Sequence, residues 1–107
     1  MDEAYEQEVK RADQALRRDD FDTAFQHLER AHVLAQRMTG RHTFIHWRML
    51  VAGLRRGDVG EVLGQVPRIA ASILFSRLWV PRGNSGRARV SSLKRMPVPD
   101  DLRHLVP

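Results

Sequence analysis

Histidine is the residue type in this chain whose spacing could support chemistry. Four of the five histidines fall within twenty residues, and they are His27, His32, His42 and His46. The chain contains no cysteine, so a transition-metal site would have to be built from imidazole and carboxylate groups. The positions of these histidines on the predicted helices decide whether such a site can form.

The spacing of three histidines brings them together on two consecutive helices. His42 and His46 are four residues apart, which places both imidazoles on one helix face and allows them to hold one metal ion. On the preceding helix, Glu29 and His32 form Glu-x-x-His, a pair that di-iron carboxylate bundles turn inward. A short turn near Gly40 would make the two helices antiparallel and bring His32 to the height of His46. The predicted metal ligands are therefore Glu29, His32, His42 and His46.

Neutral imidazole ligands suit Zn, Cu, Ni or Fe. Gln36 lies beside His42 in this arrangement and could support or complete the site. His27 precedes His32 by five residues, about 140° around the helix, so we assign it to another face. A di-iron centre would need a second Glu-x-x-His, which the chain lacks. A competing interpretation, in which these are ordinary capping or hydrogen-bonded core histidines, stays open.

The helices that would carry these residues are predicted from hydrophobic periodicity. Apolar residues recur at spacings of three and four along four stretches. These stretches predict helices over residues 2–18, 21–38, 41–56 and 58–79, with boundaries near Asp19, Gly40 and Gly57. The second helix is expected to end at Thr39-Gly40, with Gly40 in the left-handed conformation. The core is expected to include Leu28, Leu50, Leu63 and Ile73.

Start signals precede the second and fourth predicted helices. Asp20 or Asp22 can cap the second helix. Asp58, with Glu61 three residues later, resembles a capping box for the fourth. Pro67 is expected either to kink the fourth helix or to mark a restart.

A weak internal repeat indicates how the helices are organised. Residues 16–21 match residues 54–59, and the alignment continues through several apolar positions. Each repeat would be one helical hairpin, the unit that tetratricopeptide proteins stack. The sequence therefore predicts an all-α fold, with residues 1–80 forming two helical hairpins in a tetratricopeptide-like four-helix arrangement.

Residues 81–107 are predicted to form an irregular tail packed on this domain. Prolines and glycines preclude a long helix there, and residues 83–86 form a Gly-Asn-Ser-Gly turn signal. Apolar residues could anchor the tail to the helices, and they are Trp79, Val80, Val90, Leu93, Met96, Val98 and Leu102.

Composition narrows the class of protein. The chain is 42% hydrophobic and 29% charged, as expected for a globular domain. Its net charge of +5 gathers in residues 77–94, but no nucleic-acid-binding motif contains those arginines, so we do not expect nucleic-acid binding. No apolar run reaches the roughly 20 residues of a membrane span. The acidic start does not resemble a signal peptide, so a cytoplasmic protein is expected.

Several segments of the chain resemble a small bacterial family, domain-of-unknown-function family 3703. The resemblance rests on residues 27–34, on His42 with His46-Trp47 and Met49-Leu50, and on residues 80–86 and 96–102, and it extends from Phe21 to Leu102. The chain departs from the family pattern at Ser85 and Arg87, where Thr and Gly are typical. The resemblance implies that the histidine segment and the Gly-Asn-Ser-Gly turn belong to one unit. It implies no reaction.

Three functional hypotheses follow. The first is a helical protein that binds a divalent transition metal for sequestration, sensing or delivery, and we do not expect an enzyme because no separate general base can be named. The second is a tetratricopeptide-like interaction module without metal, which binds a protein partner or a second copy of itself. The third is a small-molecule pocket between the helices and the tail.

Overall fold

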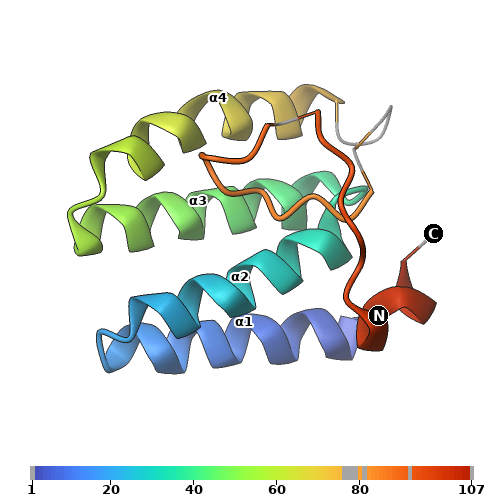
Figure 1. Cartoon of the computed structure of the whole chain (residues 1–107), viewed down its shortest axis with the longest axis horizontal. Coiled ribbons are helices and arrows are strands. Elements are labelled where there is room, and N and C mark those ends of the chain that lie inside the picture. The colour runs from blue at the N-terminus through green and yellow to red at the C-terminus, as the bar shows by residue number, and fades with distance from the viewer. Residues whose placement is uncertain (1, 76–79, 81, 92, 107) are drawn as a thin grey trace.

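A computed structural model of the chain describes residues 2–75, 80, 82–91 and 93–106 (Figure 1). It contains four α-helices and one short 3-10 helix: α1 (Asp2–Arg17), α2 (Phe21–Ala35), α3 (Thr39–Arg56), α4 (Val59–Phe75) and η1 (Asp100–Leu105). No strand occurs among the described residues, so the predicted all-α class is confirmed. None of the helices in this part of the chain is long and apolar enough to cross a membrane.

The helices pack as two hairpins, as the internal repeat predicts. α1 packs along α2, α3 packs along α4, and α2 joins the two hairpins by its contact with α3 (Figure 1). Alanines lie at the contact of the first three helices and let their backbones approach closely. The fully buried alanines are Ala12, Ala15, Ala24, Ala31, Ala35 and Ala52.

Local signals in the sequence place most of the helix ends. The Asp20 carboxylate accepts a hydrogen bond from the backbone N–H of Thr23 at 3.3 Å and caps α2. Gly57 ends α3 with a φ of 79°, which favours glycine. Asp58 accepts from the backbone N–H of Glu61 at 3.1 Å. The side chain of Glu61 is buried instead of completing the capping box.

The predicted boundary at Gly40 is wrong. α2 ends at Ala35 with Gln36 in the right-handed conformation, and α3 already begins at Thr39. The hydrogen bond from the backbone N–H of His42 to the Met38 carbonyl, 2.8 Å, starts the new helix. Gly40 therefore lies in the first turn of α3. A Cβ at Gly40 would meet no atom within 4 Å, so no close contact requires glycine there. A glycine in such a position is compatible with the start of a helix as well as with its end, and the sequence alone does not distinguish the two.

α4 differs from prediction in which side it buries. Pro67 lies inside the helix, which continues through it. Leu28 is fully buried, as predicted, and Leu50 is half-buried. Leu63 and Ile73 are 66% and 57% exposed, so their assignment to the core is wrong. α4 turns its polar residues inward instead, and those that are buried are Glu61, Gln65 and Ser72. The predicted continuation of this helix to residue 79 lies outside the described residues.

The described tail packs on the helices through part of the predicted anchor set. Val80, Val98 and Leu102 are buried. Val90 and Met96 are half-buried, Leu93 is 73% exposed and does not anchor the tail, and Trp79 lies outside the described residues. The side chain of Asn84 holds the turn together, because its amide donates to the carbonyls of Ser91 and Lys94 at 2.8 and 2.7 Å.

Candidate metal site

Three histidine nitrogens form a small triangle in the interior of the protein. His32 comes from α2, and His42 and His46 come from adjacent turns of α3. The Nε2 atoms of His42 and His46 are 3.0 Å apart, those of His32 and His42 are 3.1 Å apart, and those of His32 and His46 are 3.2 Å apart. All three side chains are buried. The three imidazoles therefore direct the same type of nitrogen to one point.

The outer ring nitrogen of His32 is fixed as a hydrogen-bond donor. Its Nδ1 lies 2.7 Å from the backbone carbonyl of Asn84 in the tail. A carbonyl oxygen can only accept, so Nδ1 carries the proton. In the neutral imidazole the other nitrogen, Nε2, then has a free lone pair, and that lone pair faces the triangle.

His46 is held in the same tautomer by a chain of hydrogen bonds from α4. Its Nδ1 lies 2.6 Å from Oε1 of Gln65. The amide of Gln65 cannot be turned round without loss, because its Nε2 donates to Glu61 at 2.6 Å and to the Gly86 carbonyl at 3.0 Å. Oε1 is thus the acceptor and Nδ1 of His46 the donor. Two lone pairs, from His32 and His46, meet across the triangle.

Burial keeps these histidines neutral. It lowers the pKa of His42 to about 3 and that of His46 to about 4. It also holds the pKa of His32 well below the usual value, with further lowering by the neighbouring His46 and His42. The Nδ1 of His42 has no hydrogen-bond partner among the described residues, but the nearby backbone of Gln36 partly offsets the lowering of the His42 pKa. Neutral imidazole is the form that binds metal.

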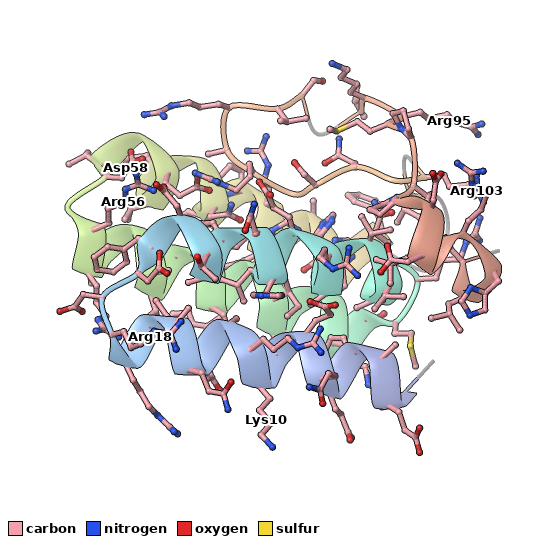
Figure 2. All side chains as sticks on the ribbon, turned by 60° about the horizontal axis from the view of Figure 1, so that its bottom comes forward. Lys10, Arg18, Arg56, Asp58, Arg95 and Arg103 are labelled. Carbon is pink, nitrogen blue, oxygen red and sulfur yellow. The ribbon has the colours of Figure 1, made fainter. Side chains whose placement is uncertain are left out.

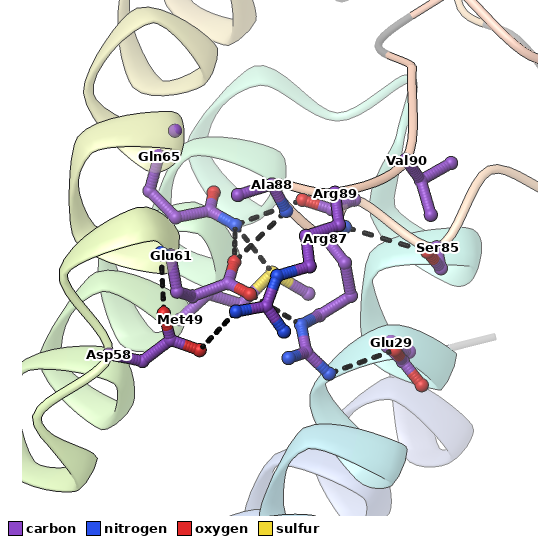
Figure 3. Close-up of polar contacts among 12 residues, drawn as sticks. Glu29, Met49, Asp58, Glu61, Gln65, Ser85, Arg87, Ala88, Arg89 and Val90 are labelled. Carbon is purple, nitrogen blue, oxygen red and sulfur yellow. Dashed lines mark hydrogen bonds and ion pairs between the residues drawn. The ribbon is translucent and has the colours of Figure 1, made fainter.

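A buried carboxylate organises the outer side of the site. Glu61 is 1% exposed and accepts three hydrogen bonds, from Nε2 of Gln65, from Nε of Arg87 at 2.7 Å and from the backbone N–H of Ala88 at 3.1 Å. Figure 3 shows it on α4 between Gln65 and Arg87. The guanidinium of Arg87 also lies 3.9 Å over the ring of Phe25. This network ties the tail, α4 and α2 to one another around the histidines.

The structure brings together three of the four predicted ligands. The candidate ligand atoms of His32, His42 and His46 lie within 4.8 Å of one another. Glu29 is not in that group, and its carboxylate instead accepts from Arg87 at 3.3 Å (Figure 3). His27 lies elsewhere, as expected, with Nδ1 paired to Glu8 at 2.6 Å.

Sequence reasoning missed the residues that orient the histidines. Glu61 and Gln65 are four residues apart and therefore share one face of α4. Two polar residues at this spacing in a largely apolar helix are a signal that could have identified them. Gly86 was predicted only as part of a turn. It has a φ of 82°, and a Cβ there would lie 2.6 Å from Cδ2 of His32, so the close approach of tail and imidazole requires glycine.

The lowered pKa values predict that the metal-free protein loses stability in mild acid. An unfolded histidine takes up its proton as the pH falls below about 6.5, whereas His42 and His46 resist protonation to about 3 and 4 when folded. Protons therefore favour the unfolded chain between those values, so this contribution is complete above pH 6.5 and lost as the pH falls toward 4. Thermal unfolding with a chelator should give a melting temperature lower by at least roughly 4–8 °C at pH 5 than at pH 7.5. Equal melting temperatures would contradict the buried, neutral triangle.

The chain matches a known family model. The model of a family described as "Protein of unknown function (DUF3703)" matches residues 1–106. No curated protein and no solved structure matches the chain.

Proposed function

The chain belongs to this family of unknown function, and we propose that it binds one divalent transition-metal ion between His32, His42 and His46. The observation that carries the proposal is the convergence of three Nε2 atoms within 3.0–3.2 Å of one another. Their burial favours the neutral imidazole, and two of the three imidazoles present lone pairs that could bind a cation. A metal ion is the simplest group that satisfies all three nitrogens at once.

The size of the triangle suits such an ion. Sides of 3.0–3.2 Å place the centre ~1.8 Å from each nitrogen, while typical Zn–N bonds are about 2.0–2.1 Å. His32, His42 and His46 would hold such an ion through their Nε2 atoms, and water or another ligand would complete its coordination. Imidazole nitrogens favour Zn, Cu, Ni or Fe over Mg or Ca.

The outer hydrogen bonds support the same function. Histidines that bind metals usually donate their second N–H to a carbonyl, carboxylate or water, which fixes the ring and raises its basicity. His32 donates to the Asn84 carbonyl, and His46 donates to Gln65, which is in turn held by Glu61. A neutral imidazole has one N–H donor and one acceptor nitrogen, and both need partners when the ring is buried. A single Nε2–H of His42 could serve only one of the two lone pairs of His32 and His46, whereas one metal ion would serve all three nitrogens.

The enclosure of the site favours holding an ion over turning over a substrate. All three imidazoles are buried, and the tail covers His32 through Asn84 and Gly86. We therefore favour sequestration, sensing or delivery of the metal over catalysis. The coordination position that water or another ligand fills would then serve for loading and release of the ion.

The test is a metal titration of the tag-free protein after treatment with a chelator. Isothermal titration with Zn²⁺ and Ni²⁺ should give one ion per chain. Co²⁺ should give the visible absorption of a nitrogen-ligated site with low symmetry. Binding should persist at pH 6, where exposed histidines with a pKa near 6.5 are mostly protonated, because the pKa values of His42 and His46 are about 3 and 4. Weak, unsaturated heats for every ion would refute the proposal.

A small-molecule site has one observation in its favour. A groove of about 480 Å³ lies between α2 and the tail, and its lining includes His27, Arg30 and Met96. Two of the polar groups there already serve the fold, since Arg30 pairs with Glu8 at 2.9 Å and with Asp101, and His27 pairs with Glu8 at 2.6 Å. The histidine triangle is therefore the better-supported site.

A further inference from the structure

The two outermost helices of the layer, α1 and α4, differ in the polarity of their outward surfaces. α1 forms one end, and its outward side chains are polar or charged, as Figure 2 shows for Lys10. α4 forms the other end (Figure 1), and its outward stripe is apolar. A helical array needs a polar outer face on its terminal helices to remain a monomer in water. α1 meets this requirement and α4 does not.

The apolar stripe continues from α4 onto α3. Three contacts set the register of these antiparallel helices: Thr43–Ser72, His46–Gln65 and Gly53–Glu61. When antiparallel helices touch, the residue that follows each contact residue turns toward the same side of the pair. On α3 these following residues are Phe44, Trp47 and Leu54. On α4 they are Val62, Val66 and Ile73. The tail lies on the opposite side, where Ala88 meets Gly64.

We call this surface, which the described residues leave exposed, the α3–α4 outer face. Its exposed members are Phe44, Trp47, Leu54, Val59, Leu63, Val66, Ile73 and Leu74. Each is between 43% and 67% exposed. At ~100 Å² of exposed surface each, the face amounts to on the order of 800 Å², above the about 300–600 Å² that a typical monomer exposes in one patch. Each partner in a stable protein–protein complex contributes about 800 Å².

The charges around the face favour self-association over binding to a charged partner. The charged residues of α4 are Glu61 and Arg68, and both turn away from the face, toward the tail. On α3, Arg48 pairs with Asp13 and Arg55 with Asp19 of the first hairpin. Among the described residues, two copies can therefore meet through the apolar members of this surface without opposing like charges, although each chain carries a net charge of +5. The described residues of the face include no basic group to which an acidic partner could bind.

We propose that two copies of the chain associate through the α3–α4 outer face, with α4 packed on α4 of the partner copy about a twofold axis. A twofold axis brings the same apolar stripe from both copies together and closes the assembly at two. The proposal is independent of metal binding, because the histidine triangle lies on the inner side of α3.

The test is the mass of the full chain in solution, by light scattering after size exclusion and by sedimentation equilibrium. The wild type should have twice the mass of one chain at high micromolar concentration, with chelator and with Zn²⁺ alike. Leu63→Glu should shift the protein to a monomer, because a charge at a fully desolvated contact opposes association. Leu93→Glu is the matched control, since Leu93 is equally exposed but lies in the tail, and it should remain a dimer.

Sulfate should strengthen the association of a dimer that is held by apolar contacts. Other outcomes would contradict the proposal. A wild type that is monomeric at every concentration overturns the proposal, and so does a dimer that Leu93→Glu disrupts as strongly as Leu63→Glu. Monomeric wild type that sediments with phosphatidylglycerol vesicles, and loses this binding in Leu63→Glu, would assign the face to a membrane surface and also overturn it. Circular dichroism of both variants should match the wild type, because both positions are exposed.

Discussion

His46→Ala is expected to remove stoichiometric metal binding from the protein. The change leaves two nitrogens of the triangle and takes away the one that Gln65 orients at 2.6 Å. Structural zinc sites with four ligands bind with about 10–16 kcal/mol, so one ligand is worth roughly 3–4 kcal/mol, on the order of 100- to 1000-fold in affinity. Isothermal titration with Zn²⁺ at neutral pH measures the loss. The alanine variant should still fold, because it leaves no buried charge behind.

Three further variants show whether the loss is specific. His27→Ala and His104→Ala should titrate like the wild type, because His27 pairs with Glu8 and His104 is exposed in η1. Gln65→Leu keeps all three ligands but removes the acceptor for His46, and it should weaken binding about 10- to 100-fold. The proposed function fails if His46→Ala titrates as the wild type does. If the Gln65→Leu variant binds metal with unchanged affinity, Gln65 does not orient His46 for binding, but the proposed metal site itself is not contradicted.

Leu28→Ala is expected to destabilise the fold strongly. Leu28 is fully buried where α1, α2 and α3 meet. Truncation of a leucine in such a position costs about 2–5 kcal/mol, because apolar contacts are lost and a cavity remains. Urea unfolding should therefore show a much lower midpoint with an unchanged slope.

Leu93→Ala provides the comparison for this change. It removes the same atoms from a side chain that is 73% exposed, so its effect should stay within about 0.5 kcal/mol. Leu93 also lies outside the α3–α4 outer face, which keeps the comparison free of any effect on association. Similar losses in the free energy of unfolding for the two variants would contradict the burial of Leu28 in the core.

The sequence predicts the helices and the histidine triangle well because both depend on local spacing. The spacing of four residues from His42 to His46 places both on one helix face whatever the rest of the chain does. His32 meets them because the connection between α2 and α3 is short. Glu29 satisfies the same local rule, yet its carboxylate bonds to Arg87, which is 58 residues away in sequence. No local pattern reveals where a distant arginine comes to lie.

The inward side of α4 is the second failure, and it has a related cause. Hydrophobic periodicity assumes that the apolar stripe of a helix faces the core. In α4 the polar stripe faces inward, because Glu61 and Gln65 bond to the tail and to His46. Leu63 and Ile73 consequently turn to solvent. A helix that supplies hydrogen bonds to a buried site can invert the usual pattern, and periodicity does not distinguish the two cases.

The contact of the tail with His32 has a consequence for how an ion would leave. The Asn84 carbonyl orients the imidazole, and Gly86 lies against its ring. Binding of the proposed ion and docking of the tail are thus two linked equilibria. The factor by which a docked tail raises the affinity for the ion equals the factor by which the bound ion favours docking of the tail. A protease, a partner or a modification that lifts residues 84–86 would weaken the hold on the ion by the same factor that the ion adds to the hold on the tail. If the protein delivers the proposed ion, a recipient that displaced the tail would thereby weaken the binding of that ion.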